Sequence, residues 1–183
     1  MKAGFAKSDI TPSRPLRLSG YGNRDRPYEG IDAPIFARTL AVRDSKGELT
    51  VWTAVELLGV TSAMRQEVLD IVGESSLSPE RFILCATHTH TAPHVKGVAS
   101  NLFGPKMNAA EIDAMNEYTA FAVKQIAQSI VDALKDLKPG KLEIGWGKGS
   151  FAANRRVLNN GKWKGFGVQK DGPVDHRLPV IRI

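Results

Sequence analysis

The stretch Glu48-Leu49-Thr50-Val51-Trp52-Thr53-Ala54-Val55-Glu56-Leu57-Leu58 is apolar on both of the faces that a strand presents. Two apolar faces are typical of a strand with a central position in a covered sheet. Asp44-Ser45-Lys46-Gly47, just before it, is a hairpin turn signal, and the β-rich residues Ile35 to Arg43 precede that turn. The sequence therefore predicts an antiparallel hairpin whose second strand lies inside the sheet.

Glu56 is the one acidic side chain in the apolar part of that strand, and a buried carboxylate needs a partner. Two interpretations stay open for it. We favour a structural ion pair, and the alternative is an acid at the edge of an active site.

The segment after this strand predicts a crossover to a parallel neighbour. Thr61-Ser62 is a helix start signal, and apolar residues recur at helical spacing up to Val72. A second apolar strand is expected from Arg81 to Ala86. Strand, helix and strand in this order favour a right-handed parallel unit, whose carboxyl edge carries the next loop.

The remaining segments complete an α/β prediction. Strands are expected at Lys2 to Ile10, Lys141 to Gly149 and Leu178 to Ile183, and the longest helix runs from a capping box at Asn108 to about Leu137. Long loops are expected at 11–34 and 87–107, and a Gly-, Lys- and Trp-rich loop lies before the last strand. We predict a mixed β-sheet covered by helices, with residues 1–183 as an incomplete, amino-terminal portion of a larger catalytic domain, because the chain stops within an apolar strand.

Three of the four histidines lie within Leu84-Cys85-Ala86-Thr87-His88-Thr89-His90-Thr91-Ala92-Pro93-His94, directly after a predicted strand. Residues two apart in an extended segment point the same way, so His88 and His90 are expected to face one pocket. Such a pair is suited to hold a metal or to move a proton. Cys85, within the apolar run, is expected to be a small buried hydrophobe.

Charge and composition narrow the classes of protein. The net charge is +6, but the basic residues are scattered among acids, and the densest basic cluster, Lys162, Lys164 and Lys170, lies in a Gly-rich segment, so no nucleic acid partner is expected. No apolar stretch approaches the roughly 20 residues of a membrane span. Met1 to Phe5 lacks the features of a signal peptide, so we expect a cytoplasmic location unless an export signal was removed. The sequence leaves the oligomeric state open.

Six short motifs occur in order along the chain: Ala3–Pro12, Gly20-Tyr21-Gly22, Ile35–Leu40, His88–Pro93, Asn154-Arg155-Arg156 and Gly172–Asp175. This set resembles the amino-terminal half of the neutral/alkaline non-lysosomal ceramidase family, a group of zinc-dependent amidases. The resemblance implies that His88 is a zinc ligand, His90 a neighbouring catalytic histidine and Arg155 a catalytic residue that clamps the substrate. It also implies a zinc-dependent hydrolase of a linear amide, with a small-molecule or lipid amide such as a sphingolipid as substrate.

The resemblance places the other zinc ligands, a histidine, a glutamate and a tyrosine, beyond Ile183. Catalytic zinc usually takes three protein ligands and a water. We therefore expect weak Zn²⁺ binding, with His90 and His94 as possible substitute ligands, and little or no activity from these residues alone. The alternative is a non-catalytic ligand-binding domain derived from the same fold.

Overall fold

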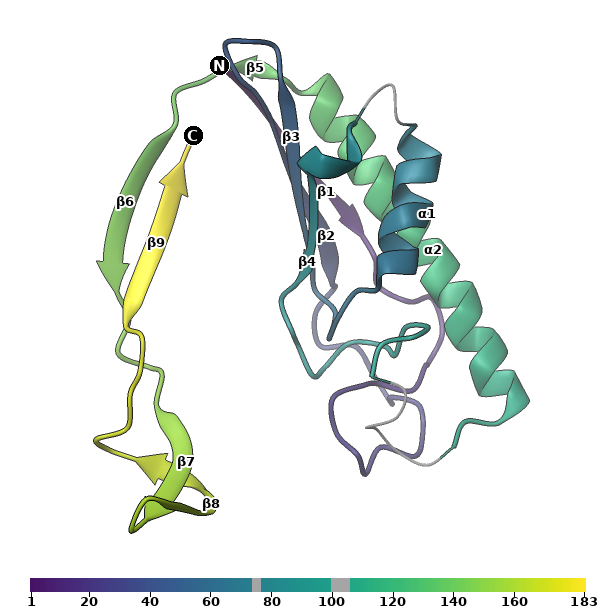
Figure 1. Ribbon diagram of the computed structural model, residues 1–183. Coiled ribbons are helices and arrows are strands. Elements are labelled where there is room, and N and C mark those ends of the chain that lie inside the picture. Colours follow the sequence, from purple (N-terminus) through teal and green to yellow (C-terminus); the bar gives the residue numbers. More distant parts are fainter. Residues whose placement is uncertain (74–76, 100–105) are drawn as a thin grey trace. The chain divides into compact units, whose positions relative to one another are not determined.

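The computed structural model describes residues 1–73, 77–99 and 106–183, so residues 100–105 of the predicted loop 87–107 lie outside the described residues. The chain forms two compact units, Met1–Pro139 and Gly140–Ile183. Each unit has its own sheet structure (Figure 1). That residues 1–183 form one amino-terminal portion of a catalytic domain stays a prediction. The two units are described one at a time.

The first unit is built on a mixed, five-stranded sheet with the order β4-β3-β2-β1-β5. Its strands are β1 (Lys2–Asp9), β2 (Phe36–Arg43), β3 (Leu49–Val55), β4 (Phe82–Ala86) and β5 (Lys138–Pro139). β3 pairs with β2 in antiparallel register and with β4 in parallel register, and the β1–β2 and β1–β5 pairs are antiparallel. The predicted hairpin, the interior position of its second strand and the parallel crossover are confirmed.

Two helices cover one face of this sheet (Figure 1). α1 (Ser62–Val72) begins where the side chain of Thr61 accepts a hydrogen bond from the Met64 amide. α2 (Ala109–Lys135) begins with the predicted capping box, in which Asn108 and Glu111 satisfy each other's backbone amides. A short 3₁₀ turn (Pro79–Arg81) leads into β4. Among the described residues, no helix has the combination of length and apolar character needed to cross a membrane.

Close backbone contact holds α2 against the sheet. A Cβ added at Gly4 would lie 2.0 Å from the Ala133 carbonyl oxygen, so only glycine fits under this part of the helix. Deeper in the layer, the hydroxyls of Thr39 and Ser129 are 2.6 Å apart, and Thr39 also contacts Thr53 at 2.9 Å. These buried polar atoms are satisfied by one another, which fixes the register of helix on sheet.

The opposite face of the same sheet is not covered within the described part of this unit. Trp52 is 37% exposed, Ile83 45% and Phe5 53%. Cys85 lies on this face and is exposed, so the prediction of a buried cysteine is wrong. β3 is therefore apolar on both faces, as predicted, but its helices lie on one side only.

The second unit consists of two antiparallel pairs. β6 (Glu143–Lys148) pairs with β9 (Arg177–Arg182), and β7 (Asn154–Asn159) pairs with β8 (Lys162–Gln169). The Gly-, Lys- and Trp-rich segment that was predicted as a loop is thus mostly a β-hairpin. Its turn is Asn160-Gly161, with φ of 49° and 74°, the two left-handed conformations that a two-residue hairpin loop requires.

Candidate active site

The histidine segment continues the line of β4 along the end of β3. The Thr87 amide donates to the Val55 carbonyl at 2.9 Å, and the Thr89 amide donates to the Leu57 carbonyl at 3.3 Å. These bonds extend the parallel pairing two residues beyond β3, to Leu57, and three residues beyond β4, to Thr89. The predicted position of the histidines, at the carboxyl edge of a parallel strand pair, is confirmed.

His88 is oriented by its backbone and by one hydrogen bond. Its φ of 61° is left-handed. Residues other than glycine rarely adopt this conformation, and those that do are often found at functional sites. Its Nδ1 lies 2.8 Å from the Leu58 carbonyl oxygen. Because a carbonyl only accepts, Nδ1 carries the proton and the lone pair is left on Nε2. A metal-binding histidine typically has this arrangement, with a carbonyl fixing the tautomer from behind.

His90 is held by packing. Its ring centroid is 5.1 Å from that of His88 and 4.8 Å from that of Tyr21, both edge to face. A Cβ added at Gly20 would lie 2.5 Å from His90 Cγ, and the φ of Gly20 is +105°. The buried His90 Nδ1 has no hydrogen-bond partner among the described residues. Contact with Gly20 and Tyr21 therefore sets the position of the ring.

Two long loops are joined here. Leu18 and Pro93 form an isolated antiparallel bridge, the Ser19 amide donates to the Ala92 carbonyl at 3.1 Å, and the His94 amide donates to the Arg17 carbonyl at 2.9 Å. This pairing brings part of the 11–34 loop against the histidine loop. The sequence marks Gly20-Tyr21-Gly22 as a family motif but carries no local signal for its contact with His90.

His94 lies in a buried environment and does not join the pair. It is 6% exposed, and burial, followed by the nearby charge of Arg17, lowers its pKa. Arg17 itself forms a largely buried ion pair with Glu111 at 2.6 Å, which ties this loop to the start of α2. His94 thus packs where the loops meet the helix.

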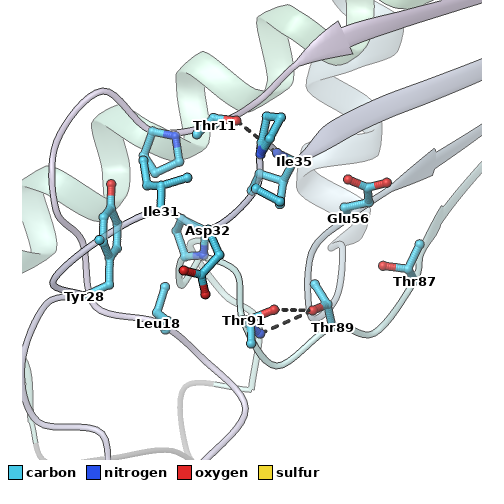
Figure 2. A pocket seen from close by; sticks show the side chains of 15 residues that line it. Thr11, Leu18, Tyr28, Ile31, Asp32, Ile35, Glu56, Thr87, Thr89 and Thr91 are labelled. Carbon is cyan, nitrogen blue, oxygen red and sulfur yellow. Dashed lines mark hydrogen bonds between the residues drawn. The ribbon is translucent and has the colours of Figure 1, made fainter.

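A cavity of about 420 Å³ lies on the other side of the histidine segment (Figure 2). Thr87, Thr89 and Thr91 line it, whereas His88 and His90, which alternate with them, do not. Glu56 also lines the cavity, and its carboxylate accepts hydrogen bonds from Arg38 Nε at 3.1 Å and from the Phe36 amide at 2.9 Å. The predicted ion pair of Glu56 is confirmed, and it holds the carboxylate at the cavity wall.

Arg155 lies in the second unit, on β7, with an exposed side chain. Its role beside the histidines stays a prediction. Within the described ranges, no three His, Cys, Asp or Glu side chains lie close enough to form a metal site. His88 fits the chemistry of one zinc ligand, and the described residues supply no complete set.

Comparison with known proteins identifies relatives. The sequence model described as neutral/alkaline non-lysosomal ceramidase, N-terminal, matches residues 1–159, which include His88, His90 and Arg155. Neutral ceramidases of Drosophila pseudoobscura pseudoobscura and Drosophila melanogaster are each 27% identical over 96 residues, 50% of this chain and 14% of theirs.

A crystal structure of neutral ceramidase from Pseudomonas aeruginosa superimposes with a TM-score of 0.66 at 25% identity, over 85% of this chain and 25% of that one. A structure described as ceramidase complexed with C2 gives the same TM-score and identity. The chain thus spans a quarter or less of the length of these relatives. Since the family match covers most of the sequence and the α/β fold agrees, this chain belongs to the neutral/alkaline non-lysosomal ceramidase family and corresponds to its amino-terminal region.

Proposed function

We propose that this chain contributes part of the active site of a zinc-dependent hydrolase that cleaves the linear amide of an N-acylated lipid. The observation that carries the proposal is the geometry of His88. Its Nδ1 is anchored 2.8 Å from the Leu58 carbonyl oxygen, which leaves the lone pair of Nε2 to bind a metal beside a second imidazole. Membership of the ceramidase family supports the reaction class.

His88 would hold the metal through Nε2. Bound zinc supplies a water of lowered pKa and polarises a carbonyl oxygen. The 5.1 Å between the His88 and His90 rings puts His90 within reach of a group beside that position, where it would move a proton or stabilise developing negative charge. Arg155 would hold the carbonyl or an anionic part of the substrate through its planar, charged donors.

The described residues alone are expected to bind zinc weakly. They offer the His88 imidazole, the neighbouring His90 and no group of three possible ligands. In this proposal the remaining ligands come from polypeptide outside these 183 residues, which agrees with the small share of each relative that the chain spans. Because the ligand set is incomplete, a second candidate function is a non-catalytic binding domain of the same fold. The experiments must distinguish this candidate from the hydrolase.

The first experiment measures the metal site by itself. Zn²⁺ is added to the 183-residue chain with isotope-labelled histidines, and the ring signals are followed by NMR. His88 signals are expected to shift first, and His88→Ala should abolish the saturable shift. His176→Ala is the matched control, because His176 also bonds a backbone carbonyl through Nδ1, at 2.9 Å from Gly149. Saturable binding that persists in His88→Ala would overturn the ligand assignment.

The second experiment measures hydrolysis of a fluorescent N-acylsphingosine by the natural gene product. His88→Ala should remove bound zinc and lower activity by at least about 100-fold, because losing a ligand exceeds the 10–100-fold effect of losing a ligand's hydrogen-bonding partner. His176→Ala should leave both unchanged. Zinc binding at His88 without any hydrolysis would favour the non-catalytic binding domain.

A further inference from the structure

The β7–β8 hairpin carries an apolar surface that its own fold does not bury. The Asn160-Gly161 turn closes it, and two irregularities in the pairing, both accommodated by extra residues on β8, interrupt its register. Leu158 pairs with Trp163, while Arg156 pairs with Phe166. Trp163 and Phe166 are three positions apart, so simple alternation would place them on opposite faces of β8, but the irregular pairing does not follow that alternation.

The irregular register gathers two aromatic rings on one face. The rings of Trp163 and Phe166 are 5.9 Å apart, edge to face, although the residues are three positions apart in the strand. Their partners Arg156 and Leu158 are two positions apart on β7 and so share this face. We call Arg156, Leu158, Trp163 and Phe166 the hairpin patch.

The hairpin patch is open to solvent. Leu158 is 51% exposed, Trp163 59% and Phe166 77%. An isolated two-stranded hairpin has no second layer with which to cover such side chains. Contiguous exposed apolar side chains of this kind mark a binding surface.

The hairpin is also strongly basic. Between Ser150 and Gly172 the basic residues are Arg155, Arg156, Lys162, Lys164 and Lys170, and Asp171 is the only acid, so five positive charges less one negative charge give +4. None of the ion pairs formed within the described part of the chain involves these basic residues. Apart from Arg155, which the proposed function assigns to the substrate, these basic residues can therefore attract an anionic partner.

We propose that the β7–β8 hairpin binds the surface of a bilayer that contains anionic lipids. Tryptophan and phenylalanine beside lysine and arginine are the side chains that suit the boundary between headgroups and acyl chains. The aliphatic Leu158 in the patch favours acyl chains over nucleic acid bases, since it offers no stacking surface. The positive charge complements anionic headgroups, to which each lysine adds attraction near the surface.

The experiment is flotation of the 183-residue chain with phosphatidylcholine vesicles that do or do not contain phosphatidylserine. These vesicles contain no amide lipid, so the result does not depend on zinc or hydrolysis. Binding is expected with phosphatidylserine only, and it should weaken as salt rises from about 0.1 M to about 1 M, because screening shortens the range of the attraction. Binding to both vesicles equally, or to neither, would overturn the proposal.

Variants locate the surface. The Lys162→Gln/Lys164→Gln pair should lower the partition coefficient by about 25-fold, or about fivefold for each lysine. Trp163→Ala/Phe166→Ala should lower it by at least about tenfold, whereas Trp163→Phe should retain most of the binding and lose the blue shift of tryptophan emission. Trp146→Ala is the matched control, because Trp146 is 70% exposed and lies on β6.

Two further outcomes would contradict the proposal. The first is a loss of vesicle binding in Trp146→Ala as large as that in the double aromatic variant, which would mean that exposed tryptophan anywhere is sufficient. Alternatively, an oligonucleotide could displace the vesicles and itself lose affinity in Trp163→Ala, which would make nucleic acid the partner. Circular dichroism of every variant distinguishes loss of the surface from loss of the fold, and Trp163→Phe gives a test that does not remove the aromatic contact.

Discussion

Replacing Gly20 by alanine would place a methyl carbon 2.5 Å from Cγ, 2.6 Å from Nδ1 and 2.7 Å from Cβ of His90. Carbon atoms in contact are normally about 3.5–4.0 Å apart, so the overlap is about 1 Å. Because it involves the Cβ of His90, a rotamer change cannot relieve it, and one of the two loops must shift. Overpacking of this kind lowers the free energy of unfolding by about 1–3 kcal/mol. The left-handed backbone at φ +105° lowers it further, by about 1–2 kcal/mol, because alanine is strained there.

The assay is urea unfolding followed by circular dichroism at the helical minimum, which reports on the first unit because both α-helices lie there. Gly47→Ala is the matched control, since Gly47 has a φ of +89° and nothing within 4 Å of an added Cβ. Gly47→Ala should lose only the stability that the strained left-handed backbone costs, without any overpacking. Gly20→Ala is therefore expected to be less stable than Gly47→Ala by about 1–3 kcal/mol. Contacts between the His90 and Tyr21 ring protons, measured by NMR, should be lost only in Gly20→Ala. Equal stability of the two variants, with those contacts intact, would refute the conclusion that Gly20 positions His90.

Two other predictions concern the charged groups behind the site. The pKa of His94 is lowered in the folded chain, so near and below the ordinary histidine pKa of about 6.5 the unfolded chain binds more protons than the folded one. The free energy of unfolding should therefore fall as the pH drops through about 6.5. Urea unfolding at pH values on either side of this point should show the loss in the wild type and a smaller loss in His94→Gln. Glu111→Gln should lower the free energy of unfolding by about 3–5 kcal/mol, since it removes one charge of a largely buried ion pair. Glu117→Gln, which alters the exposed ion pair with Arg14, should change the free energy of unfolding by no more than about 1 kcal/mol. Similar losses in these two glutamate variants, measured in the same assay, would contradict the role assigned to burial.

The sequence predicts the first unit well because its signals are local. The two apolar faces around Trp52, the cap at Thr61 and the capping box at Asn108 each depend on residues a few positions apart, and the structure has the corresponding strand and helices. The β7–β8 hairpin was missed although Asn160-Gly161 is a strong turn signal. The glycines of that segment favour a loop, and an irregular register hides the alternation from which a strand is recognised.

The sequence by itself determined the order of the main strands and helices in the first unit, the family, and the position of His88 and His90 at the end of a strand that runs parallel to its neighbour. These properties follow from periodicity, caps and short motifs, which are contained in contiguous residues. Only the tertiary structure decided that Gly20 and Tyr21 hold the His90 ring, that the Leu58 carbonyl orients His88, and that Trp163 and Phe166 meet on one face. Those contacts depend on close packing between segments that are distant in the chain, or on an irregular strand pairing, and no local pattern of residues specifies either.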